Sequence, residues 1–162
     1  MASEGLTRIA LAGYSMGGNL VLKLAGEWGS DHPELECVAA VCPAMDLAAS
    51  ADALHEPMNI LYEKYFVRRL EQRLARKVEL FPDHFQVAAA NGADTVRKFD
   101  NQVTAPFSGY RDADDYYARA AASNVIDRIA VPTLILYADD DPFIRIQPQT
   151  QAKVLANRNI QY

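Results

Sequence analysis

A glycine-rich turn between two apolar segments constrains this chain more than any other feature. Residues 7–12 (TRIALA) are apolar and end at Gly13, which predicts a short strand buried on both faces. Residues 16–27 place leucines at helical spacing, and residues 35–42 form a second short apolar run. A strand, a helix and a strand in this order predict a βαβ unit, in which the two strands are parallel and the crossover is right-handed.

The rest of the chain predicts an α/β fold with a helical insertion. Helices are expected in the middle of the chain, over 58–80, 85–98 and 112–122. The βα pattern returns with a strand over 131–138, a helix over 147–156 and the start of a further strand at 159–162. We therefore expect a single incomplete domain over 1–162, with a sheet core from 1–45 and 126–162 and a mainly helical cap from 46–125.

The segment 58–80 has the pattern of a basic amphipathic helix. Its predicted apolar stripe consists of Leu61, Tyr65, Phe66, Leu70, Leu74 and Val78. Glutamates stand among its arginines and lysines, which favours i to i+4 pairing on a solvated cap helix whose apolar stripe closes over a site. Association with a membrane surface is the alternative interpretation of the same residues.

Composition excludes several classes of protein. Lys and Arg number 16 against 21 Asp and Glu, so the basic excess of a nucleic-acid-binding protein is missing. No apolar run approaches the ~20 residues that cross a bilayer, and the amino-terminal segment lacks the pattern of a secretory signal. We expect a cytoplasmic protein.

Neither cysteine suggests a metal or redox site. Cys37 and Cys42 fall in an apolar segment, and their odd spacing predicts that they point to opposite faces of a core strand as apolar filler. No Cys or His ligand spacing accompanies them. The sequence also lacks a nucleotide or flavin fingerprint, so we expect no cofactor.

The turn itself reads Gly13-Tyr14-Ser15-Met16-Gly17, a G-x-S-x-G pentapeptide between a predicted strand and a predicted helix. In that context the motif indicates a nucleophilic serine on a strained turn, with Gly13 and Gly17 avoiding collisions with neighbouring elements and Gly18 allowing further close packing. The backbone N–H of Met16 would stabilise the oxyanion formed when Ser15 attacks an acyl carbon. The alternative is a tight turn in which Ser15 is only a helix N-cap.

A serine nucleophile needs a base and an acid. Asp141 follows the apolar run 131–138 and is the expected acid, with Asp140 as a close rival and Asp46 as an outside candidate. Each aspartate could instead stabilise a helix N-terminus. The base is missing from the pattern, because the histidines precede the acid and occupy loop or cap contexts: His32, His55 and His84.

Three segments together resemble the YheT-like, ABHD-type branch of the α/β-hydrolase superfamily. They are GYSMGGNL, the later block FDNQVTAPFSGYRDADDYY (99–117), and VPTLILYADDDPF. The resemblance implies a partial α/β-hydrolase fold, a parallel sheet with flanking helices and a helical cap insertion. It implies a serine esterase or lipase without a cofactor, acting on a small-molecule ester or acyl lipid.

By the same resemblance, Ser15 is the nucleophile, Asp141 the acid and Met16 an oxyanion-hole residue, while no residue matches the family's histidine. Family members are considerably longer, so the chain is expected to be a fragment without its base, and to self-associate because its sheet is truncated. The alternative is a non-catalytic binding module for an apolar or acyl ligand.

Overall fold

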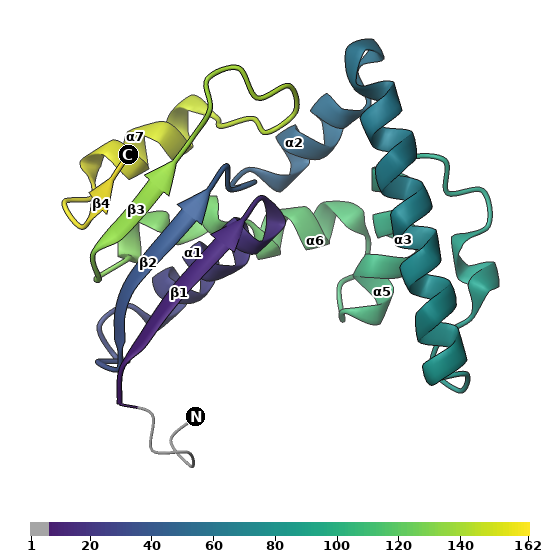
Figure 1. Cartoon of the computed structure of the whole chain (residues 1–162), viewed down its shortest axis with the longest axis horizontal. Coiled ribbons are helices and arrows are strands. Elements are labelled where there is room, and N and C mark those ends of the chain that lie inside the picture. Colours follow the sequence, from purple (N-terminus) through teal and green to yellow (C-terminus); the bar gives the residue numbers. More distant parts are fainter. Residues whose placement is uncertain (1–6) are drawn as a thin grey trace. The chain divides into compact units, whose positions relative to one another are not determined.

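The computed structural model describes residues 7–162, and its sheet has four parallel strands in sequence order (Figure 1). They are β1 (Ile9–Tyr14), β2 (Leu35–Val41), β3 (Thr133–Leu136) and β4 (Ile160–Gln161). Tyr14 is in register with Val41, and Val41 with Leu136. The carboxyl ends of the first three strands therefore meet at one edge of the sheet, where α/β proteins place their ligands.

The helices connect these strands. The longer ones are α1 (Met16–Trp28), α2 (Leu47–Leu54), α3 (Ile60–Leu80), α6 (Ala113–Ala120) and α7 (Pro148–Ala156). The chain divides into two compact units, which we call the sheet unit (residues up to 50 together with 120–162) and the helical unit (51–119). No helix within residues 7–162 is long and apolar enough to cross a membrane.

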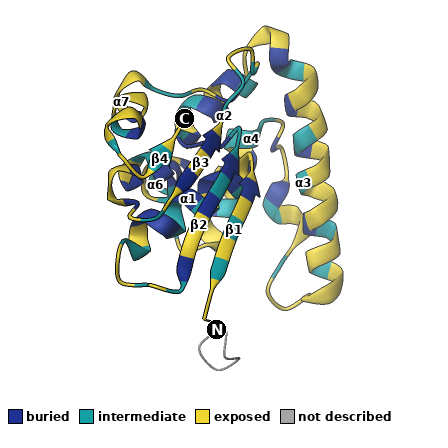
Figure 2. Ribbon diagram, turned by 60° about the vertical axis from the view of Figure 1, so that its left-hand side comes forward, coloured by how far each residue is buried: buried dark blue, intermediate teal, exposed yellow. Residues whose placement is uncertain are grey.

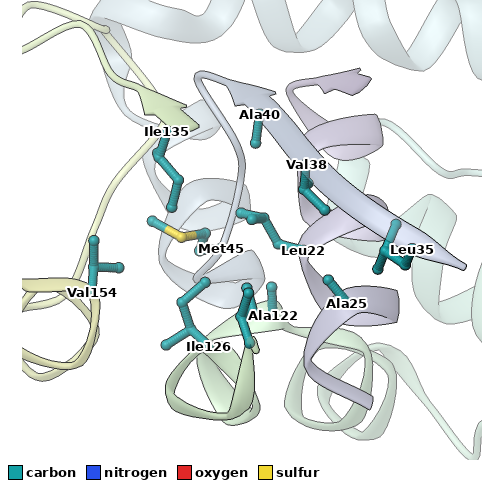
Figure 3. Close-up of a cluster of buried hydrophobic side chains, with 11 residues drawn as sticks. Leu22, Ala25, Leu35, Val38, Ala40, Met45, Ala122, Ile126, Ile135 and Val154 are labelled. Atoms are coloured by element: carbon teal, nitrogen blue, oxygen red, sulfur yellow. The ribbon is translucent and has the colours of Figure 1, made fainter. Parts of the chain in front are cut away.

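The core of the sheet unit lies between the sheet and the helices on one of its faces (Figure 3). Leu22 of α1 is wholly buried against side chains that alternate along β2, such as Val38 and Ala40. Ile126 and Val154 close the same cluster from the segments that follow the helical unit. Burying a side chain of this size stabilises the fold by about 1.5–3 kcal/mol, so these alternating positions fix which face of each strand points inward.

Within the sheet unit, the opposite face of the sheet is uncovered (Figure 2). A groove of about 520 Å³ runs over it, and its lining includes Ala10, Ala12, Cys37 and Leu134. The prediction that 7–12 is buried on both faces was wrong, and so was the assignment of Cys37 to the core, because the helices of the sheet unit cover one face only. Cys42 lies beyond the end of β2 and has a φ of 42°. The alternation of side chains along a strand therefore does not determine where its side chain points.

Helix α3 buries only part of the predicted stripe. Leu74 is buried, with Leu70 and Val78 packed beside it, as predicted, whereas Leu61 and Tyr65 are exposed. Near the start of the helix Glu63 and Val67 are buried instead, so the expectation that this glutamate faces solvent was wrong. Glu63 is 1% exposed, yet its carboxylate pairs with Nδ1 of His55 at 2.8 Å and accepts the backbone N–H of Val96 at 3.1 Å. A buried carboxylate is tolerated when its oxygens are bonded in this way.

The predicted helix over 85–98 was also wrong, since two short helical segments, Val87–Ala90 and α4 (Val96–Phe99), stand in its place. Asn91 and Gly92 interrupt the predicted helix, because Gly92 has a φ of 76°, which a right-handed helix does not accommodate. Helix α2, which is rich in alanine, was not predicted. The other predicted helices and strands are present with shifted ends.

The block 99–117 folds as one hydrogen-bonded element of the helical unit. It includes the π-helical turn Asp100–Thr104, the short helix α5 (Ala105–Phe107) and α6. The hydroxyl of Tyr117 donates to Asp100 at 2.6 Å. Burial raises the pKa of Asp100, and burial followed by the charge of Asp100 raises the pKa of Tyr116 to about 12. The bond between Tyr117 and Asp100 thus ties the end of the block to its beginning.

The bare sheet face generates a prediction about association. We expect residues 1–162, expressed alone, to form dimers or larger species in sedimentation velocity, because contact between two such faces removes apolar surface from water. Leu136 is 51% exposed on this face, so Leu136→Lys will shift the distribution toward monomer. Leu155→Lys is the matched control, since Leu155 is 67% exposed on α7. A compact monomer at all concentrations would contradict the expectation.

Candidate active site

Ser15 occupies a strained turn between β1 and α1. Its φ of 50° and ψ of −119° lie in a region that side chains other than glycine rarely adopt, at a cost of about 1–3 kcal/mol. Three backbone bonds hold it there: its N–H donates to Val41 O at 2.9 Å, and its carbonyl accepts the N–H groups of Asn19 at 3.0 Å and Ala44 at 3.3 Å. Ser15 is exposed, and although it stands at the N-cap position of α1 its side chain makes no capping bond. Capping therefore does not explain this serine.

Close approach of the backbone requires glycine on both sides of Ser15. A Cβ on Gly13 would lie 2.2 Å from the carbonyl oxygen of Gly17, and a Cβ on Gly18 would lie 2.9 Å from Cβ of Pro43. The predictions for Gly13 and Gly18 are thus confirmed. The prediction for Gly17 was wrong, because a Cβ there would meet nothing within 4 Å.

Met16 is the first residue of α1. The first backbone bond that closes a turn of this helix runs from the Asn19 N–H to the Ser15 carbonyl. The amides that precede Asn19 lie at the positive end of the helix dipole, beside the exposed serine. This is the region in which a developing oxyanion would be stabilised.

Asp141 lies in the turn that follows β3, at the same edge of the sheet. One of its oxygens, Oδ1, accepts the N–H groups of Phe143 at 3.1 Å and Ile144 at 2.8 Å. Asp141 is half-buried, whereas Asp140 is exposed. The hydroxyl of Tyr137 stabilises this turn by donating to Ile144 O at 2.9 Å. Burial, and to a smaller extent the negative charge of Asp141, raises the pKa of the Tyr137 phenol.

Asp46 contacts the start of α7. Its Oδ2 accepts the Gln147 N–H and its Oδ1 accepts the Thr150 hydroxyl, both at 2.8 Å. Ala44, two residues earlier, donates its N–H to the Ser15 carbonyl at 3.3 Å. The segment after β2 thus contacts both the serine turn and the end of the loop that carries Asp141. Asp46 bonds to the first turn of α7 and so links that helix to this segment.

The sheet order separates the two sites. Ser15 follows β1 and Asp141 follows β3, with β2 between them. Two strand spacings amount to about 10 Å. A single side chain that bonds to both would have to bridge this distance.

Among the described residues of the sheet unit, no histidine lies at the edge of the sheet that carries Ser15 and Asp141. His32 lies between α1 and β2, at the opposite edge of the sheet, where it stacks on Trp28 with ring centroids 4.3 Å apart. His55 pairs with Glu63 in the helical unit, and His84 is exposed in the turn after α3. Within residues 7–162, no group of three or more His, Cys, Asp or Glu side chains could hold a metal ion.

A parallel sheet, a strained serine turn after one strand and an aspartate after a later strand define the α/β-hydrolase class. The family model for the S33 serine aminopeptidases matches residues 2–159. The chain belongs to this family, and its relatives confirm that it lies in the YheT-like, ABHD-type branch of the superfamily.

Three relatives illustrate the similarity. The putative esterase YheT of Escherichia coli is 36% identical over 137 residues, which is 83% of this chain and 40% of the relative. The phospholipase ABHD3 of Mus musculus is 32% identical over 133 residues, 82% of this chain and 32% of the relative. The monoacylglycerol lipase of Saccharomyces cerevisiae is 32% identical over 144 residues, 83% and 31% respectively. The chain thus spans 40% or less of the length of these relatives.

The glycine contacts generate a paired prediction. Gly13→Ala places a Cβ inside the backbone of α1 and will lower the free energy of unfolding by about 3 kcal/mol or more. Gly17→Ala meets open space within a helix, so it will be neutral or will raise that free energy by up to about 1 kcal/mol. Urea unfolding followed by circular dichroism measures both. Equal destabilisation by the two substitutions would contradict the described turn.

Proposed function

We propose that this chain carries the nucleophile and the acid of a serine carboxylic-ester hydrolase that acts on small-molecule esters or acyl lipids. The observation that carries the proposal is the exposed Ser15, held at positive φ by backbone bonds without acting as a cap. A fold does not keep such strain without a compensating use or over-determined surroundings. The names of the relatives, which include an esterase, a phospholipase and a monoacylglycerol lipase, support the reaction class.

In the proposed reaction a base removes the proton of Ser15 as Oγ attacks the acyl carbon of the ester. The carbonyl oxygen becomes negatively charged, and the Met16 N–H donates to it at the positive end of α1. Collapse of the tetrahedral intermediate expels the alcohol, which receives the proton from the base, and leaves the acyl group on Ser15. Water, activated by the same base, then releases the carboxylic acid.

Asp141 is the proposed acid, in preference to Asp140. Two backbone N–H bonds fix Oδ1, and Oδ2 is proposed to orient a protonated imidazole. The base is proposed to be a histidine outside residues 1–162, in a longer protein of which this chain is a part. The greater length of the relatives supports this assignment.

Fluorophosphonate labelling tests the proposal. The probe is applied to residues 1–162 and to a version extended at both ends by the neighbouring coding sequence. We expect labelling of Ser15 in the extended protein, its loss in Ser15→Ala, and labelling at least about a hundredfold slower in 1–162 alone, because a triad without its base loses most of its rate.

Ser30→Ala is the control, since Ser30 is exposed in the loop after α1 and takes no part in the proposed chemistry. If neither protein is labelled although circular dichroism shows both to be folded, the hydrolase proposal is overturned. The non-catalytic binding module would then be the better interpretation.

A further inference from the structure

The helical unit contains a cavity of about 260 Å³ that none of the proposed chemistry uses. We propose that it binds a small amphiphilic carboxylate, with an apolar body in the cavity and its carboxylate against two cations of α3. The inference does not depend on Ser15 being a nucleophile, because every residue of the cavity belongs to the helical unit.

The floor of the cavity is apolar. Leu74, Phe99 and Val103 are buried there and belong to the core cluster of the helical unit. Phe85 and Phe107 form one end, with their ring centroids 4.8 Å apart. Phe107 is 46% exposed, so an apolar ligand that covers this ring removes surface that the described residues leave in water.

The charged residues that line the cavity are cations, and Thr104 and Ser108 add two hydroxyl groups. Arg73 and Lys77 stand one helical turn apart on α3 and both line it. Nζ of Lys77 lies 5.0 Å from the ring centroid of Phe85, which holds the ammonium group over the aromatic end. No acidic residue lines the cavity. Within residues 7–162, neither cation forms an ion pair, in contrast to Arg76, which bonds to Glu79 at 2.7 Å.

These features define the ligand chemistry. Two cations beside an apolar floor complement an anion with a hydrocarbon or aromatic body. The volume lies just below the range of about 300–1,000 Å³ that is usual for small-molecule sites, so the site suits one short chain rather than a two-chain lipid. A medium-chain carboxylate such as octanoate fits this description.

Titration calorimetry of residues 1–162 with octanoate tests the proposal, with amide chemical-shift mapping on the same samples. We expect saturable binding at one site, with the largest shifts in 70–77 and 99–108. The double variant Arg73→Gln and Lys77→Gln will weaken octanoate binding at least tenfold. Both residues are exposed, so this variant will keep the fold. Octanol, which has the same chain without the charge, will bind at least tenfold more weakly than octanoate.

The matched control is the double variant Arg68→Gln and Arg69→Gln. It removes the same charge from exposed positions of α3 that do not line the cavity, and it will leave the affinity within twofold. Equal affinity of octanoate for both double variants would overturn the proposal. So would equal binding of octanol and octanoate, absence of saturable binding, or shifts centred on the sheet groove around Ala10 and Leu134.

Discussion

The positive φ of Ser15 depends on the close approach of β1 to the first turn of α1, and much of the sheet unit follows from this contact. Gly13 allows the approach, since a Cβ there would lie inside the backbone of the helix. Asn19 continues the same constraint one turn later. Its buried side chain accepts the Ala122 N–H at 2.8 Å and donates to Ala120 O at 3.1 Å, which ties α1 to the segment that returns from the helical unit. The turn, the helix and the re-entry of the chain therefore depend on one close contact.

The parallel register carries this constraint to the rest of the site. Because the strands end together, the turns after β1, β2 and β3 share one edge of the sheet. The turn after β2 links the other two, through Ala44 to the Ser15 carbonyl and through Asp46 to the beginning of α7. Ser50 adds a bond from the Arg145 N–H at 3.2 Å. Backbone and capping bonds of this kind position the proposed groups before any substrate arrives, which is the condition for electrostatic catalysis.

The sequence predicted the sheet unit better than the helical unit, for a physical reason. A βαβ unit is defined by local periodicity and by glycine positions, so its strands, its helix and the serine turn were recognisable. Whether the second face of the sheet is buried depends on which segments cover it, and the sequence around Cys37 does not indicate those segments. The burial of Glu63 on α3 depends on its partners His55 and Val96, which helical periodicity does not indicate. Asp141 was proposed from its place after a strand, whereas the two bonds to its Oδ1 are visible only in the structure.

In the proposed site, the strained turn presents the hydroxyl of Ser15 beside the first amide of α1. A crystal structure of the protein extended at both ends, after reaction with a small alkylphosphonate ester, tests this arrangement. We expect phosphorus bonded to Ser15 Oγ, with a phosphoryl oxygen within about 3 Å of the Met16 backbone nitrogen. Phosphorus on another residue, or a phosphoryl oxygen directed away from Met16, would contradict it.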